Sequence, residues 1–451
     1  MSDRSWIAIA CAVALAAGAG CYKPNPASNL PSLLASSDGE QPLAGPAYAF
    51  INGQWFNGTE FKSRTYYAVN GMLETRRPPR VDSTIDLHGG FVIPPFADAH
   101  THNLDGPYNL DTVVARYIRE GTFYVQVLTN SQTGAHQVRW KFNHPCALDV
   151  AYANGGLTST LSHPFQAYEP AAAGYGYNSA VWRQNWAAIR KSRKLENDTY
   201  WFIDSVPDLA AKWPGILAGH PDLIKIFLLS ASEAAQPVPP DSIDFSGHGL
   251  KPSLVPLIVR RAHDAGLRVA AHIETAADFE IAVRSGVDIL AHLPGYEMGQ
   301  HESEPEREIS EAVATVAGEH GIVVTPTVSL ASIVVNDPDS AGLVQRRQML
   351  QRHNIALLLR HGVRFAVGSD RFGQTARGEF DALHALGLWD NLGLLKMWSE
   401  TTARSIFPTR RIGRLEPGYE ASFLVFDRDP IKDIEALRDI DLRVKQGCIM
   451  Q

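Results

Sequence analysis

Short apolar runs alternate with stretches of helical periodicity through the middle of the chain. The runs are rich in Val, Ile, Leu and Ala, which is typical of parallel strands buried on both faces. Helical periodicity is clearest over 253–265 and 276–285, and each stretch ends before a glycine. The apolar runs are the one leading into His100, 122–128, 147–152, 223–229, 268–273, 287–292, 322–326 and 364–369. Eight strand–helix units over about 300 residues predict an α/β fold, a (β/α)8 TIM-type barrel.

An open doubly wound sheet is the alternative α/β fold. Such a sheet usually carries a glycine-rich phosphate loop after its first strand, and none follows the run before His100. The barrel is therefore the preferred interpretation. It predicts that functional side chains lie at the C-terminal ends of the strands.

Both ends of the chain show a different pattern, with short alternating segments and tight turns. Asn-Gly turns punctuate 47–85, and strand and turn signals return from residue 412 onward. The two ends are therefore expected to meet in one small β-sandwich domain. The predicted boundaries are 46–92 and 406–451 for the two parts of the sandwich and 93–405 for the barrel.

Composition and charge change this picture in one respect. The chain of 451 residues is 45% hydrophobic and 20% charged, and its formal net charge is -7. The densest basic group, Arg76, Arg77 and Arg80, is explained by a solvated loop. No basic stripe of the kind that binds phosphate backbones is present. The sequence therefore predicts no nucleic-acid partner, and it leaves the oligomeric state open.

The N-terminal segment has the pattern of an export signal. Arg4 precedes an apolar stretch over 6–17 that is too short to span a bilayer comfortably. The sequence Gly-Ala-Gly-Cys ending at Cys21 resembles the lipobox of bacterial lipoproteins, with Gly18 where Leu is usual. Residues 1–21 are thus expected to be a signal peptide with lipobox, and 22–45 a flexible tether. The mature protein is expected to be extracytoplasmic, either periplasmic or membrane-anchored through an acylated Cys21; a simple secretory signal is the alternative.

Two cysteines lie beyond this segment, Cys146 and Cys448. Their spacing does not decide whether they form a disulfide, and it does not match a thiolate metal site.

The most informative polar residues are His100 and His102, which close an apolar run in the sequence Phe-Ala-Asp-Ala-His-Thr-His. On a strand, this spacing points both imidazoles to the same side, where they can bind one metal ion. A solvated strand end is the alternative reading of the pair.

Four further polar residues lie in or directly after apolar runs. They are Lys225, His272, His292 and Asp370. Alone, a histidine at a strand end is more often a satisfied core residue, and an aspartate after Gly-Ser is often a turn or helix cap. Their order along the predicted strands 1, 4, 5, 6 and 8 makes a shared site the better interpretation.

With these residues, the chain resembles the amidohydrolase superfamily from about residue 47 to the C-terminus. The closing string Ile-Gly-Arg-Leu-Glu-Pro-Gly, followed by Ala-Ser-Phe-Leu-Val-Phe-Asp, is similar to the return of that family to its small domain, with Ser422 where Asp is commoner. Ile-Lys-Ile around Lys225 is most similar to the imidazolonepropionase-like and prolidase-like branch. Residues 228–232 depart from the Thr-Gly-Gly that often follows, which puts the substrate in doubt but not the metal chemistry.

The resemblance implies six metal-site residues: His100, His102, Lys225, His272, His292 and Asp370. The strand-1 histidines and the aspartate would hold a first divalent metal, and the histidines of strands 5 and 6 a second. Zinc is preferred, and manganese and iron stay open. A buried lysine whose pKa is lowered can add carbon dioxide, so Lys225 is expected to be a carboxylated bridging lysine. The alternative is an ordinary buried lysine paired with a carboxylate.

The implied function is an exported metal-dependent hydrolase of carbon–nitrogen bonds, in amides, cyclic amides or dipeptide-like substrates. Metal-activated hydroxide would attack, and Asp370 would carry the proton to the leaving nitrogen. Two alternatives remain: a lactonase or phosphotriesterase on the same metal centre, and a lipoprotein that binds metal or solute without turnover. The aromatic segment 162–186 could close over an apolar substrate or simply pack on its neighbours. Arg371 and Arg377 could pair with a substrate carboxylate or form structural ion pairs.

Overall fold

The computed structural model describes residues 46–231, 249–333 and 340–450. The expected signal segment 1–21 and tether 22–45 lie outside these residues. Among the helices of the described part, none has both the length and the apolar composition that crossing a membrane requires.

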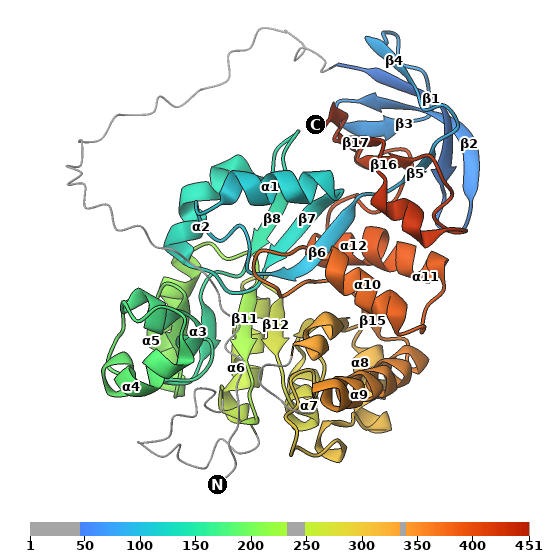
Figure 1. Ribbon diagram of the computed structural model, residues 1–451. Helices are drawn as coiled ribbons and strands as arrows, with labels where there is room; N and C mark the ends of the chain where they lie inside the picture. Colours follow the sequence, from blue (N-terminus) through green and yellow to red (C-terminus); the bar gives the residue numbers. More distant parts are fainter. Residues whose placement is uncertain (1–45, 232–248, 334–339, 451) are drawn as a thin grey trace, which may run out of the picture.

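Two parallel sheets form the centre of the larger part of the molecule (Figure 1). The three-stranded sheet has the order β6 (Phe96–Thr101), β7 (Thr122–Val127) and β8 (Asp149–Tyr152). The seven-stranded sheet has the order β10 (Tyr200–Phe202), β9 (Gly156–Thr158), β11 (Ile224–Phe227), β12 (Val269–His272), β13 (Ile289–Ala291), β14 (Val323–Thr325) and β15 (Arg364–Phe365). The strands are almost entirely buried, which explains their continuous apolar sequences.

Backbone hydrogen bonds join both edges of the three-stranded sheet to the seven-stranded sheet. On one side the amide of Ala99 donates to the carbonyl of Val367 at 2.8 Å, directly after β15. On the other side the amide of Asp222 donates to the carbonyl of Tyr152 at 2.8 Å, directly before β11. The arrangement is a TIM-barrel-like α/β fold, in agreement with the predicted class.

Helices cover the outside of these sheets (Figure 1). They are α1 (Leu110–Arg119), α2 (Gln132–Val138), α5 (Val206–Ala218), α6 (Val255–Asp264), α7 (Ala276–Ser285), α8 (Glu311–Glu319), α9 (Ser340–Arg360), α10 (Arg377–Ala385), α11 (Asn391–Lys396) and α12 (Thr402–Ile406). Shorter turns are η1 (Arg139–Lys141), η3 (Pro252–Leu254), η4 (Pro305–Arg307), η5 (Val328–Ser332), η7 (Ile434–Arg438) and the π-helical η6 (Met397–Thr401). Helix α7 shows why the predicted bounds were accurate: Thr275 and Asp278 form a capping box, and Gly286 ends the helix at φ 82°.

All eight predicted apolar runs contain a strand, but the segment after β8 was predicted incompletely. Strands β9 and β10 were missed because each has only three residues and no alternating pattern. The aromatic segment 162–186 contains the helices α3 (Phe165–Ala172) and α4 (Ser179–Ile189). Their aromatic side chains form a separate small core with those of β10.

Strands from both chain ends share one mixed sheet beside the barrel (Figure 1). Its order is β18 (Cys448–Ile449), β17 (Leu442–Lys445), β16 (Phe423–Phe426), β5 (Phe91–Ile93), β1 (Tyr48–Phe56), β2 (Phe61–Val69) and β3 (Met72–Glu74), with β4 (Ser83–Asp86) also paired to β1. The antiparallel pair of β5 and β16 joins the two ends. The small domain expected as a sandwich is thus held together as a single hydrogen-bonded sheet.

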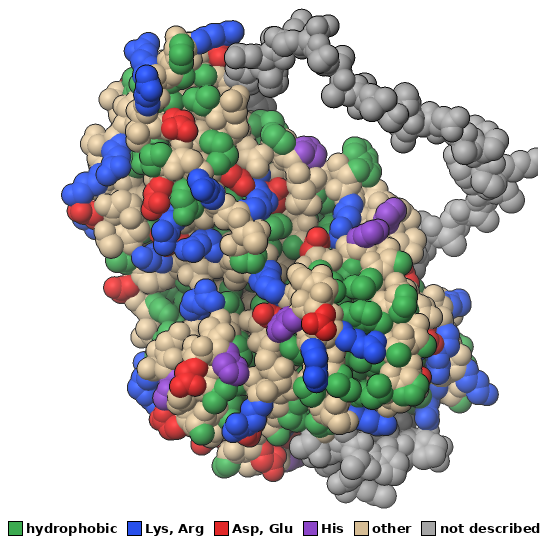
Figure 2. Space-filling view, turned by 180° about the vertical axis from the view of Figure 1, so that it is seen from behind, with side chains coloured by type: hydrophobic (Ala, Val, Ile, Leu, Met, Phe, Trp, Pro, Cys, Tyr) green, Lys and Arg blue, Asp and Glu red, His purple; other side chains and the backbone are tan. Residues whose placement is uncertain are grey.

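Charged side chains of both signs are interspersed over one face of the molecule (Figure 2). Mixed charge of this kind favours solubility and does not concentrate a positive potential along one track.

A disulfide between Cys146 and Cys448 fastens the end of this sheet to the barrel. The sequence alone had left this bond open. Next to it in the chain, the fully buried ammonium of Lys445 lies 2.8 Å from Oδ2 of Asp149 at the start of β8. Both contacts tie the last strands of the chain to the N-terminal end of the barrel strands.

Removing the disulfide should lower stability without affecting the metal site. Because the bond closes a loop with a sequence separation of 302 residues, the double substitution Cys146→Ser with Cys448→Ser should reduce the free energy of unfolding by about 2–5 kcal/mol. Urea unfolding followed by circular dichroism measures this change. An unchanged unfolding midpoint would show that the bond does not constrain the fold.

Candidate metal centre

Three potential metal ligands converge at the C-terminal end of β6. His100 lies in the strand and His102 lies one residue beyond its end. Their Nε2 atoms lie 3.2 and 2.9 Å from Oδ1 of Asp370, which shows that both rings point to the same side. The donor atoms of the three residues lie within 4.8 Å of one another, so a single cation could contact all three.

Parallel pairing brings the other predicted residues to the same end of the barrel. Lys225 lies two residues before the position of β11 that pairs with His272, and His292 directly follows β13. Nε2 of His292 lies 3.6 Å from Oδ2 of Asp370. The His292 ring centroid lies 4.5 Å from that of His272 and 5.0 Å from that of His100. The six predicted residues therefore form one cluster, in which all but one are buried.

The environment keeps most of the histidines neutral. Burial, joined by repulsion from neighbouring cationic groups, lowers the pKa of His100, His272 and His292 well below the usual value. For His102, burial acts in the same direction, but the hydrogen bond and charge of Asp370 outweigh it and raise its pKa. Neutral imidazole is the form that binds a metal, so three of the four rings already have the required protonation state.

Lys225 is 1% exposed, and its Nζ has no hydrogen-bond partner among the described residues. Burial lowers its pKa to about 7, so a large fraction of the amine is neutral near neutral pH. Nε2 of His272 also lacks a hydrogen-bond partner in the described part, with Oε1 of Glu274 at 3.5 Å. Buried polar atoms without partners are costly. These atoms, the neutral imidazoles and the carboxylate of Asp370 together fit a bound divalent metal with nitrogen and oxygen ligands.

Hydrogen bonds at Nδ1 fix which nitrogen of two histidines faces the centre. Nδ1 of His102 lies 3.1 Å from the carbonyl oxygen of Thr129, to which it can only donate. Nδ1 of His292 lies 2.7 Å from Oγ1 of Thr327, whose own hydroxyl donates to the carbonyl of Pro326. Thr327 therefore accepts from His292. In both rings Nε2 is therefore the nitrogen directed towards Asp370, and it is the atom available to a metal when the ring is neutral.

Replacing Thr327 by valine should weaken metal binding. The substitution keeps the side-chain shape but removes the acceptor that orients His292, and loss of such a partner typically costs about 10- to 100-fold in metal affinity. Thr327→Ser keeps the acceptor and serves as the matched control. Competition titration with a zinc chelator measures both variants. Equal zinc affinity of Thr327→Val and the unmodified protein would contradict the orienting role.

Asp98 connects β6, which carries His100, to the segment after β15 that carries Asp370. Its Oδ1 accepts hydrogen bonds from the amides of His100 at 3.3 Å and Ser369 at 3.0 Å. Its Oδ2 accepts from the hydroxyls of Ser369 and Tyr117. Burial raises the pKa of Asp98 to about 7. In the sequence, Asp98 stood out only as a neighbour of the histidine pair. Its complete burial on the same strand as His100, seen in the structure, indicates the bracing role.

His163 is a further residue of the site that the sequence did not single out. Its ring is stacked against that of His272, with 5.1 Å between centroids. Burial lowers its pKa to about 3. His163 lies in the segment between β9 and α3, outside the regular alternation of strands and helices. No spacing rule therefore connects it with the other histidines. Tyr296, which follows β13 and is stacked on His292 at 4.2 Å, was also not singled out from the sequence.

The aromatic segment only partly contributes to the site. Tyr168 of α3 places its hydroxyl 3.2 Å from Nδ1 of His102. Phe165, Trp182 and Trp186 instead belong to the small core shared with β10. The packing interpretation is therefore confirmed for these three side chains, and closure of the segment over a substrate stays a prediction.

Arg377 has a structural role. Its guanidinium donates to the carbonyl of Leu437 at 2.9 Å and lies 4.5 Å from the ring centroid of Trp398. These contacts favour the structural interpretation over pairing with a substrate carboxylate. Arg371, directly after Asp370, is partly exposed.

The C-terminal half of the chain matches a known family. Residues 246–449 match the model of the amidohydrolase family. The match includes His272, His292 and Asp370, and it confirms the family predicted from the sequence. The other three predicted amidohydrolase ligands lie before the matched segment.

Solved amidohydrolase-type structures share the fold over most of the chain. A prolidase complexed with N-methylphosphonate-L-proline has a TM-score of 0.65 and 19% identity, covering 90% of this chain and 99% of that one. A Xaa-Pro dipeptidase with bound methionine has a TM-score of 0.65 and 17% identity, covering 90% and 100%. Ochratoxinase of A. niger has a TM-score of 0.67 and 16% identity, covering 90% and 95%. Comparison with curated proteins gave no match.

Proposed function

We propose that this protein is a metal-dependent hydrolase of carbon–nitrogen bonds that acts on amides, cyclic amides or dipeptide-like substrates. The observation that carries the proposal is the convergence of His100, His102 and His292 on the carboxylate of Asp370. The match of residues 246–449 to the amidohydrolase family model supports the reaction class. The prolidase and dipeptidase structures with the same fold make dipeptide-like amides the first substrates to test.

We place this site in an eight-stranded (β/α)8 barrel over residues 93–405, with the small domain formed by 46–92 and 406–451. The hydrogen bonds at both edges of the two sheets support this arrangement. The site then lies at the C-terminal ends of the strands, where catalytic residues of such barrels are found.

The residues present suit two metals, for which zinc is our first choice. His100, His102 and Asp370 would hold the first, and His272 and His292 the second. Lys225 would bridge them as a carbamate: its neutral Nζ forms a bond to the carbon of carbon dioxide and loses one proton. Burial, which lowers the pKa of this lysine to about 7, supports the step. An ordinary buried lysine is the alternative.

When bound, the metals would lower the pKa of a water molecule towards about 7 and polarise the scissile carbonyl. The carboxylate of Asp370 would take the proton released in the attack and deliver it to the leaving nitrogen. Asp98 would keep the aspartate in place through its bonds to Ser369. His163 and Tyr168 lie against the metal-binding histidines and would limit the access of further water.

A panel of substrates tests the reaction class. Zinc-loaded protein should release amine from dipeptides, N-acyl amino acids or cyclic amides, and the Asp370→Asn variant should not. The same donor set could cleave lactones or phosphotriesters. Turnover of lactones or phosphotriesters alone would overturn the carbon–nitrogen assignment, and tight zinc binding without any turnover would favour a binding protein.

We further propose that the enzyme works outside the cytoplasm, with Cys21 as a lipid attachment site. The disulfide between Cys146 and Cys448 supports an oxidising compartment, where such bonds persist. Metabolic labelling with a radioactive fatty acid should mark the full-length protein and not a Cys21→Ser variant. Equal labelling of both would refute lipid attachment at this cysteine.

A further inference from the structure

Two carboxylates without a cationic partner lie beside the predicted metal ligands. Glu274 follows β12 by two residues, and Glu297 lies in the segment after β13. The amide of Gly295 donates to the carbonyl of Glu274 at 3.1 Å, which holds the two segments together. Both side chains are partly buried, and neither has a Lys or Arg nitrogen within 4 Å among the described residues.

The charges of these two groups act on each other and on Asp370. Burial, together with repulsion by Asp370, raises the pKa of Glu297 to about 7, and attraction by Arg347 offsets only part of this effect. Burial also raises the pKa of Glu274 well above its usual value, and repulsion by Glu297 adds to the effect. The three carboxylates therefore lie close enough to repel one another. A positively charged ligand between them would relieve this repulsion.

An unpartnered nitrogen faces Glu274. His272 is 4% exposed, and its Nε2 has no hydrogen-bond partner within the described ranges. This nitrogen lies 3.5 Å from Oε1 of Glu274, too far for a good hydrogen bond. A buried polar atom without a partner is costly and points to a bound ligand. Because the same nitrogen is a predicted metal donor, Glu274 lies directly beside the place where the scissile carbonyl of a substrate would be polarised.

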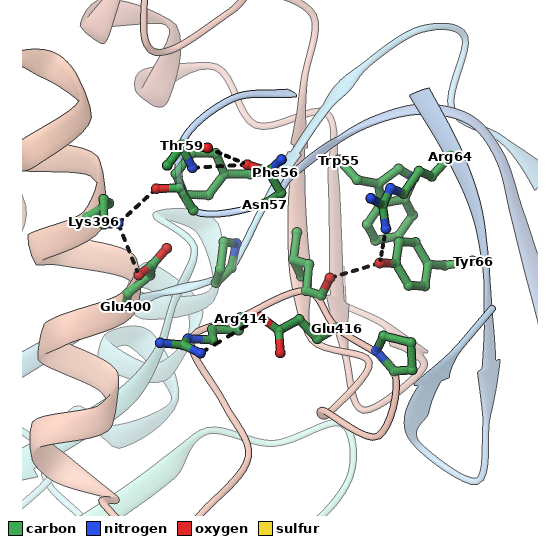
Figure 3. A pocket seen from close by; sticks show the side chains of 14 residues that line it. Trp55, Phe56, Asn57, Thr59, Arg64, Tyr66, Lys396, Glu400, Arg414 and Glu416 are labelled. Atoms are coloured by element: carbon green, nitrogen blue, oxygen red, sulfur yellow. Dashed lines mark hydrogen bonds and ion pairs between the residues drawn. The ribbon is translucent and has the colours of Figure 1, made fainter. Parts of the chain in front are cut away.

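Neighbouring carboxylates differ, because they already have partners. Asp278 accepts a hydrogen bond from the amide of Ala231 at 2.7 Å, and Oε2 of Glu302 lies 2.7 Å from Nη2 of Arg307. Acidic residues that line the cavity between the small sheet and the barrel also have cationic partners (Figure 3), namely Glu400 with Lys396 at 4.0 Å and Glu416 with Arg414 at 3.8 Å.

We propose that Glu274 and Glu297 bind the α-ammonium group of a dipeptide substrate whose scissile carbonyl lies at the metal centre. The inference rests on the proposed function and narrows its substrate class to peptides with a free amino terminus. In such a peptide the nitrogen lies only about 2.5 Å from the carbonyl carbon. A cation bound beside His272 is therefore the amino terminus and not a distant basic side chain. Carboxylates suit this group because they form charge-assisted hydrogen bonds with an ammonium.

Binding of two phosphonates tests the contact without turnover. 1-Aminoethylphosphonate and ethylphosphonate differ in the ammonium group, and both offer anionic oxygens to the metals. Isothermal titration of zinc-loaded protein should show at least about tenfold tighter binding of the amino compound, the value of a charge-assisted hydrogen bond. Glu274→Gln should remove this preference, while zinc content and the affinity for ethylphosphonate stay unchanged. Glu297→Gln should reduce the preference.

Glu280→Gln is the matched control. It removes an exposed carboxylate from α7, the helix that follows Glu274, and should keep the preference. Equal affinity of the unmodified protein for the two phosphonates, or an unchanged preference in Glu274→Gln, would overturn the proposal. Loss of zinc and of both ligands in Glu274→Gln would also overturn it, because Glu274 would then hold metal and not the ammonium.

Turnover tests the substrate class. L-alanyl-L-leucine should be cleaved with a kcat/KM at least about tenfold higher than propionyl-L-leucine, which lacks only the ammonium group. Equal kcat/KM values would overturn the restriction to peptides with a free amino terminus. Absence of cleavage of either compound, with the phosphonate preference retained, would refute the proposed hydrolase function and still support the ammonium contact.

Discussion

Replacing Asp370 by asparagine should reduce turnover by about 10²- to 10⁴-fold while most of the bound metal is kept. The amide oxygen can still approach a metal, and His100, His102 and His292 remain around it. The amide cannot accept the proton of the attacking water, and loss of a general base has an effect of this size. Steady-state turnover and elemental analysis of the same preparation measure the two quantities.

The matched control is Asp105→Asn. Asp105 is a partly buried carboxylate near His102, and burial raises its pKa to about 6, but it does not belong to the ligand group. We expect this variant to keep most of its activity. Near-normal turnover of Asp370→Asn would refute the proton-transfer role, whereas loss of all metal in that variant would show that Asp370 acts mainly as a ligand.

Replacing Lys225 by methionine should remove about one metal per chain and abolish most turnover. Methionine fills a similar volume and places no polar atom in the buried position, so the barrel should stay folded. The bridging carbamate cannot form in this variant. Elemental analysis after zinc loading measures the loss, and unchanged zinc content would contradict the bridge.

The same variant has a second readout in the metal-free protein. The pKa of Lys225 is about 7 in the folded chain, against about 10.4 in an unfolded one. Between these values the unfolded state binds one more proton, so the stability contribution of this group rises with pH from about 7 to about 10. In Lys225→Met this part of the pH dependence should be absent. Urea unfolding at several pH values measures the difference between the two proteins.

The sequence predicted the barrel strands and the main ligand group because both leave local signals. The apolar runs at 122–128 and 287–292 are continuous because parallel strands are buried on both faces. His100 and His102 form a short-range motif. Lys225 and Asp370 were found by asking which strands end in a side chain that can bind metal.

What the sequence missed depends on contacts between distant segments. Asp98 braces the site through Ser369, which is 271 residues away, and Thr327 orients His292 across the gap between β13 and η5. His163 reaches the metal-ligand candidates from the segment after β9, and this strand is too short to show a pattern of apolar and polar residues. The bond between Cys146 and Cys448 could not be inferred, because a pairing over 302 residues leaves no local trace.

Metal titration with a catalytic readout tests the central claim most directly. Metal-free protein is titrated with zinc in the presence of bicarbonate, and release of amine from an active dipeptide or N-acyl amino acid is followed at each step. The account predicts negligible activity without metal and a rise to a plateau at about two zinc ions per chain. Full amine release by protein that contains no metal would contradict it.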